Sequence, residues 1–167
     1  MTAMYSLTHV HLLLNHFPII VTMLGLLLVA VAMWRRSDFL ARVALYFFVG
    51  GALSALPTYL TGDSAEETVL HMPGVTRALI ESHSDAALIS AIFVGVLGVF
   101  ALWALWRFRA TPLLPAWVVR VALVASIIGS GLMSWTGLLG GQVRHTEVRS
   151  DFVPPPRPAG PDAPAAP

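Results

Sequence analysis

The sequence predicts an all-α integral membrane protein, an up-and-down bundle of four transmembrane helices with a proline-rich, extended C-terminal tail. Three observations support this prediction. The 167 residues are 56% hydrophobic and only 11% charged, whereas an ordinary soluble domain carries about 25% charged residues. Four long stretches contain no charged residue, and seven of the twelve prolines fall in the last 17 residues. Such a tail has little to bury and favours an extended, polyproline-like conformation.

Each charge-free stretch is long enough to cross a membrane. They cover residues 1–34, 43–62, 86–106 and 121–143. A helix rises 1.5 Å per residue, so about 20 residues cross a hydrocarbon core of about 30 Å. The chain is therefore predicted to form a transmembrane domain over residues 1–150 and a tail over residues 151–167. The expected spans are about 9–34, 43–62, 84–106 and 117–143.

The ends and connections of these spans have their own signals. The opening residues lack a basic segment and a small-residue cleavage site, so the first stretch is interpreted as a retained span. Pro18 cannot donate to the carbonyl of Leu14, so the first helix is expected to kink or begin there. The loop over residues 63–82 is long, and we expect it to be partly helical with a break at 72–74. The other two loops are short, which favours antiparallel neighbours.

Arginine distinguishes the two faces of the predicted bundle. The two short loops hold six arginines and one acid, whereas the other face holds four arginines and eight acids. The arginines of the short loops are Arg35, Arg36, Arg42, Arg107, Arg109 and Arg120. Because basic loops stay in the cytoplasm, both termini are expected outside. For a bacterial chain this means a multi-pass protein of the inner (cytoplasmic) membrane with periplasmic termini.

All six histidines are expected at the outer face. Three open the first span, one lies in the long loop, one precedes the third span and one follows the fourth. They are His9, His11, His16, His71, His83 and His145. Because successive spans alternate in direction, these positions fall on the same side of the membrane. The chain has no cysteine, which excludes disulfides, iron–sulfur clusters, blue-copper sites and thioether-bound c-type haem.

Three interpretations of the histidines remain open. They are ordinary interfacial residues, ligands of haem b, or ligands of a transition metal together with Asp63, Glu66, Glu81 or Met72. A b-type haem needs imidazoles from facing helices, a slot lined by small or apolar side chains, and cations for its propionates. The absence of His-x-x-His and His-x3-His spacings in the helices disfavours the metal.

The fourth span offers such a slot. Small residues share one of its faces with a histidine at the outer end; they are Ser130, Ser134, Gly137, Gly141 and His145. The predicted ligands, for one or two haems b or for a metal, are His16 and His83 first, then His145 and His11. The predicted cofactor-binding set also includes Gly137, Gly141 and Arg144, the last for a propionate. His9 and His71 are expected to be surface residues.

Four short motifs resemble those of a family of small, four-span bacterial membrane proteins of unknown function. They read HLLLNHFPII (11–20), TGDSA (61–65), ESH (81–83) and GGQVRH (140–145), and the resemblance covers roughly residues 8–147. The chain departs from the family in having Leu12 after the first histidine and no aromatic residue between the closing glycines and His145. Relatives in this family are fused to Rieske or c-type cytochrome domains, which implies a redox role.

These observations predict a b-type haem-binding electron-transfer subunit with its redox site at the outer face of a larger respiratory or redox complex. Its expected partners are the lipid bilayer, other membrane or periplasmic redox subunits such as a c-type cytochrome, and the quinone pool, but not nucleic acid. No span carries an ionisable side chain near its middle, so no independent enzymatic activity is expected. The alternatives are a non-redox membrane scaffold or anchor subunit and a transition-metal-binding membrane protein.

Overall fold

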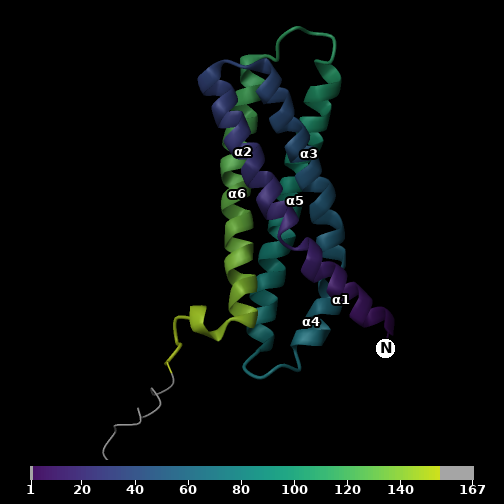
Figure 1. The fold of residues 1–167 in the computed structure, drawn as a ribbon, viewed down its shortest axis with the longest axis vertical. Coiled ribbons are helices and arrows are strands. Elements are labelled where there is room, and N and C mark those ends of the chain that lie inside the picture. The colour runs from purple at the N-terminus through teal and green to yellow at the C-terminus, as the bar shows by residue number, and fades with distance from the viewer. Residues whose placement is uncertain (1, 155–167) are drawn as a thin grey trace, which may run out of the picture.

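The protein is a bundle of apolar helices (Figure 1). The computed structural model describes residues 2–154, and within this range it contains helices and no strand. The elements are α1 (Thr2–Leu14), α2 (Phe17–Arg35), α3 (Asp38–Leu60), α4 (Gly62–Val69), α5 (Arg77–Arg107), α6 (Ala116–Arg144) and the single-turn 3₁₀ helix η1 (Thr146–Val148). Four segments of the described chain are long and apolar enough to cross a membrane: Leu7–Arg35, α3, α5 and α6. The predicted all-α, four-span membrane bundle is confirmed.

The first span consists of two helices. α1 ends at Leu14 and α2 begins at Phe17, with Pro18 in the first turn of α2, where its missing N–H is not needed. The N–H of Asn15 still donates to the carbonyl of His11, at 2.8 Å. The expectation that the helix kinks or begins near Pro18 is therefore confirmed. Figure 1 shows α1 diverging from α2 toward α4, against which it packs.

The other helices extend beyond the charge-free stretches. α5 begins at Arg77, where the side chain of Thr76 caps the helix by accepting from the N–H of Leu79. It therefore includes His83, which the sequence placed just before the third span. The long loop contains α4, followed by a turn in which Gly74 has a φ of +76°. This turn lies at residues 72–74, where a break was predicted. A helix continues past its apolar stretch wherever caps and neighbouring helices satisfy its polar ends.

The core lies between the four spans and depends on small residues. α2 packs against α3 and α6, and α5 packs against the same two helices. Phe48 and Leu45 of α3 are fully buried at the centre. A β-carbon at Gly25 would lie 2.5 Å from the ring of Phe48, and one at Gly98 would overlap Ala52. Glycine therefore allows the helices to approach closely around a few large side chains.

The outward faces of the helices are apolar. Leu27, Leu53 and Val99 are 61%, 69% and 70% exposed. Contiguous exposed apolar surface of this extent would aggregate in water and matches the solvation offered by lipid tails. The protein is therefore a multi-pass membrane protein that contacts the lipid bilayer. The predicted extended tail is described only to residue 154, and residues 155–167 lie outside the described part of the chain.

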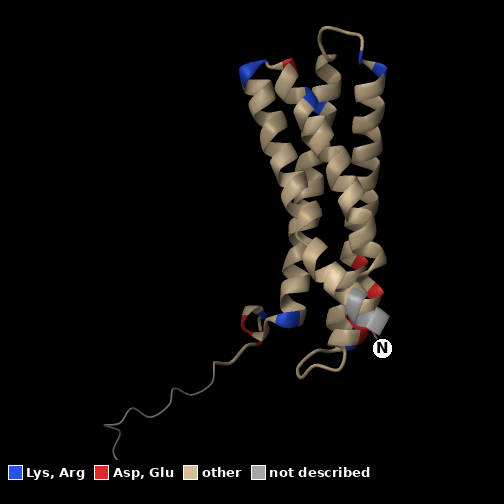
Figure 2. Ribbon diagram, turned by 45° about the vertical axis from the view of Figure 1, so that its right-hand side comes forward, with Lys and Arg blue, Asp and Glu red and all other residues tan. Residues whose placement is uncertain are grey.

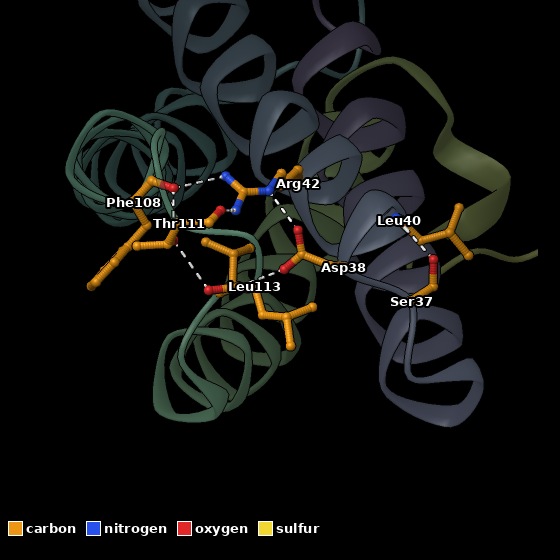
Figure 3. Close-up of polar contacts among 8 residues, drawn as sticks. Ser37, Asp38, Leu40, Arg42, Phe108, Thr111 and Leu113 are labelled. Atoms are coloured by element: carbon orange, nitrogen blue, oxygen red, sulfur yellow. Dashed lines mark hydrogen bonds and ion pairs between the residues drawn. The ribbon is translucent and has the colours of Figure 1, made fainter.

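At the arginine-rich end (Figure 2), an ion pair at the start of α3 forms hydrogen bonds with the turn between α5 and α6 (Figure 3). The guanidinium of Arg42 donates to the carboxylate of Asp38 at 2.6 Å, and to the carbonyls of Phe108 and Thr111 at 3.1 and 3.0 Å. Asp38 also accepts a hydrogen bond from the backbone N–H of Leu114. One pair on α3 thus anchors the turn between α5 and α6.

Candidate functional site at the histidine end

The histidines lie at the end of the bundle opposite the two short arginine-rich loops. Figure 1 shows this end, where α1, α4, the start of α5 and the end of α6 meet. His11 on α1 and His83 on α5 are half-buried, and the other four histidines are exposed. The two half-buried imidazoles therefore define the candidate site.

His83 is held between α5 and α6. Its Nδ1 lies 3.1 Å from the carbonyl oxygen of Thr136; since a carbonyl only accepts, Nδ1 donates and Nε2 keeps its lone pair. The hydroxyl of Thr136 in turn donates to the carbonyl of Ala86, at 3.0 Å, and contacts the hydroxyl of buried Ser90, at 2.7 Å. A β-carbon at Gly140 would lie 2.9 Å from Cε1 of His83, so the ring fills the space a side chain would need there.

His11 is held in the same way between α1 and α3. Its Nδ1 lies 2.9 Å from the carbonyl oxygen of Thr58 and therefore also donates, leaving Nε2 as an acceptor. The hydroxyl of Thr58 lies 3.3 Å from the carbonyl of Leu14 and 2.8 Å from the carbonyl of Ser54 in its own helix, so the two carbonyls share one donor. A β-carbon at Gly62 would lie 4.0 Å from Cε1 of His11. We refer to this reciprocal pair of hydrogen bonds, histidine to threonine carbonyl and threonine hydroxyl to backbone carbonyl, as the His–Thr clasp.

The two clasps have the same construction. Both lie at the histidine end of the bundle, where a charge on His11 would disfavour a second positive charge on His83. Both rings have the tautomer fixed by a backbone carbonyl, which is how proteins usually orient a histidine whose other nitrogen binds a metal. Asn15, one turn beyond His11, has a buried Oδ1 that has no hydrogen-bond partner within the described structure. The site therefore combines two oriented imidazoles with a buried polar atom whose hydrogen bonding is unfulfilled.

The structure places the other predicted ligands differently. His16 is the N-cap residue of α2, and its exposed side chain makes no capping hydrogen bond. The Nδ1 of His145 lies 2.9 Å from a carboxylate oxygen of Glu147, and both side chains are 58% exposed. The pKa of Glu147 is lowered first by the hydrogen bond its carboxylate accepts from its own backbone N–H and then by His145. His11 and His83 are thus half-buried and hydrogen-bonded to a neighbouring helix, whereas His16 and His145 are exposed.

The predicted glycine slot is divided between two roles. Gly137 packs against Ile19 of α2, since a β-carbon there would lie 3.2 Å from its Cδ1. Gly141 faces open space, and Arg144 is exposed beside it. Arg149 instead donates to the carbonyl of Gly74, at 2.7 Å, and thereby attaches the segment after α6 to the long loop.

Within the described residues, no group of three or more histidine and acidic side chains converges as it would around a metal ion. A bis-imidazole haem iron needs only two protein ligands, because the porphyrin supplies the other four.

Sequence reasoning missed Thr58, Thr136 and Gly140. Hydroxyls and small residues are frequent in membrane helices, where they usually serve helix packing. One signal was present in the chain: Thr-x-Leu-x-Gly occurs at residues 58–62 and again at 136–140. In each case the threonine and the glycine flank a clasped histidine from a neighbouring helix.

The fold and its polar end define a multi-pass helical membrane protein of four spans with a histidine-bearing end. Residues 8–148 match the family described as predicted membrane protein, DUF2231, and the chain belongs to this family. The resemblance seen in the four sequence motifs is thereby confirmed. Neither a curated protein nor a solved structure matches the chain.

Proposed function

We propose that this protein is a membrane-embedded b-type haem-binding electron-transfer subunit of a larger respiratory or redox complex. The observation that carries the proposal is the pair of clasped, half-buried imidazoles of His11 and His83, which come from different spans at the same end of the bundle. Two such imidazoles with free Nε2 atoms are the ligand set of a six-coordinate b-type cytochrome. No cysteine is needed for a haem bound in this way.

The surrounding residues suit this role. The carbonyls of Thr58 and Thr136 hold each imidazole in one tautomer, so neither ring has to reorient when a ligand binds. A haem bound here would supply one-electron exchange. The protein would supply the ligands and their orientation.

The charge distribution supports a partner on the histidine side. Arginine dominates the short loops at the other end (Figure 2), and this asymmetry favours a periplasmic histidine face in the bacterial inner membrane. That face carries eight acids against four arginines in the sequence, which suits a basic soluble carrier such as a c-type cytochrome. The quinone pool, which lies within the bilayer, is a second candidate partner.

The first prediction concerns cofactor content. The full-length protein, purified in detergent from haem-replete cells, should show a reduced-minus-oxidised spectrum of a b-type cytochrome and carry stoichiometric iron. The pyridine haemochrome assay identifies the haem, and an unrelated four-span protein purified alongside controls for adventitious haem. A preparation without b-type absorbance and without iron would contradict the proposal. It would favour the non-redox scaffold, for which replacement of the histidines leaves assembly and electron flux intact.

A further inference from the structure

The buried residues of the two helical hairpins occupy corresponding positions. The buried residues of α2 are Pro18, Thr22, Gly25, Val29 and Ala32. Adding 72 to each number gives Ser90, Val94, Leu97, Ala101 and Ala104, all of which are buried on α5. All five buried residues of α2 thus correspond to buried residues of α5, which also buries Gly98 between two of them. α2 and α5 therefore present equivalent faces to the core.

The returning helices correspond with a second constant shift. Four of the six buried residues of α3 follow this shift, and they are Ala44, Phe48, Gly51 and Ala55. Adding 78 gives Ala122, Ser126, Gly129 and Met133, which are buried on α6. The contacts between the helices follow both shifts: a β-carbon at Gly51 would lie 2.9 Å from Thr22, and one at Gly129 would lie 3.7 Å from Val94.

The polar contacts at the histidine end obey the same two shifts. In the first clasp, His11 donates to the carbonyl of Thr58, whose hydroxyl is shared between the carbonyls of Leu14 and Ser54. In the second clasp, the equivalent residues are His83, Thr136 and Ala86. Gly62 and Gly140, beside the two rings, are also related by the second shift. The clasps are thus two copies of one structural element.

Both hairpins run in the same direction. α2 and α5 lead from the histidine end to the arginine end, and α3 and α6 return (Figure 1). Each leading helix packs against both returning helices, so rotation about an axis along the bundle relates the halves. Membrane proteins built from parallel repeats have this symmetry, and their ligand sites tend to lie where the repeats meet.

Only one pair of histidines is related by the repeat. His11 corresponds to His83, whereas the positions equivalent to the other four histidines carry different residues. Those positions are Glu81 for His9, Leu88 for His16, Arg149 for His71 and Glu67 for His145. We infer that the protein is two equivalent helical hairpins that share one iron site, to which His11 from the first hairpin and His83 from the second contribute one Nε2 each. This inference rests on the proposed haem-binding function and specifies its ligands and its stoichiometry of one haem per chain.

Substitution of the ligands by methionine tests the inference without removing a ligand. Histidine–methionine ligation keeps the iron six-coordinate and raises its reduction potential relative to bis-histidine ligation. His11→Met and His83→Met should each give a low-spin haem with a raised potential. His11→Ala and His83→Ala should each lower haem affinity by about tenfold or more, with partial recovery of the low-spin spectrum on addition of imidazole. His71→Ala, on the exposed loop, is the matched control and should leave the spectrum, the potential and the haem content unchanged.

Variants of the other histidines distinguish a wrong ligand assignment from a protein that does not bind haem. His16→Met and His145→Met should leave the potential and the electron paramagnetic resonance spectrum unchanged. If either of them shifts the potential while His11→Met does not, the shared site is wrong although haem binding stands. Two haems per chain, each lost with a different histidine, would also overturn it. A wild-type protein without haem would contradict the proposed function itself.

Discussion

Gly140 lies where the imidazole of His83 leaves no room for a β-carbon, and its neighbour Gly141 faces open space. Alanine at an open position in a helix stabilises it by about 1 kcal/mol relative to glycine. At Gly140 the new methyl group would meet an imidazole ring held by a hydrogen bond, and overpacking of this kind costs about 1–3 kcal/mol. The two substitutions should therefore have opposite effects on stability.

Gly140→Ala should accordingly unfold at a lower temperature than the parent protein, and Gly141→Ala at the same or a higher temperature, in thermal unfolding followed by circular dichroism in one detergent. Gly140→Ala should also alter the haem spectrum, because the ring of His83 has to move. Equal unfolding temperatures for the two variants would mean that His83 does not lie against Gly140.

The histidines were recognised in the sequence, but their pairing was not. Depth in the membrane follows from counting residues along a helix, which is why the histidine end could be predicted. The direction of a side chain around the helix depends on the break at Asn15 and His16, where the regular hydrogen bonding stops between α1 and α2. Past such a break the helical phase cannot be extrapolated. The sequence favoured His16 because it lies deepest in the first span, whereas in the structure His16 is exposed and His11 is half-buried.

At the scale of elements, the positions of the spans follow from hydropathy alone, because a charged residue in hydrocarbon is too costly to be frequent. The lengths of the helices do not follow from it. Asp38 begins α3 and Arg77 begins α5, so charged residues lie within the terminal turns of helices, where water or a partner is within reach. The contacts of Asp38 with the other loop could not be predicted from the sequence, because they depend on which turn lies opposite it in the assembled bundle.

The pair Asp38–Arg42 gives an element-scale prediction. Arg42 makes three hydrogen bonds with its fork of N–H groups, and lysine keeps the charge but cannot reproduce that fork. The Arg42→Lys variant should lose about 1–3 kcal/mol of stability because carbonyls of the turn between α5 and α6 lose a donor. Limited proteolysis should show faster cleavage at residues 108–114. Arg35→Lys, at an exposed position at the end of α2, should match the parent protein; the same loss there would indicate a general effect of arginine in these loops.

For the whole molecule, the four-span architecture could be predicted, but the repeat could not. The solvent imposes the architecture on any sequence of this hydropathy. Corresponding positions of the two hairpins are buried alike and make similar close contacts. Their residue types often differ, as Thr22 and Val94 or Phe48 and Ser126 do. Such pairs share a location in the core but no chemical identity. Only the Thr-x-Leu-x-Gly segments, which support the clasps, remain similar enough to be seen in the sequence.

The orientation of the bundle decides which partners can reach the site. Basic loops are retained in the cytoplasm, so the arginine-rich turn between α5 and α6 should be cytoplasmic and the segment after α6 periplasmic. The chain has no cysteine, so a single introduced cysteine reports its own side of the membrane. Ala110→Cys in that turn and Ser150→Cys after α6 are both at exposed positions.

A membrane-impermeant maleimide added to intact spheroplasts should label Ser150→Cys and should label Ala110→Cys only after the cells are lysed. Equal labelling after lysis controls for the accessibility of the two thiols, and the parent protein controls for background. With this result, a periplasmic electron carrier could dock within reach of His11 and His83, and a cytoplasmic dehydrogenase could not. The opposite labelling would place the histidine end in the cytoplasm and would require a cytoplasmic partner for the same site.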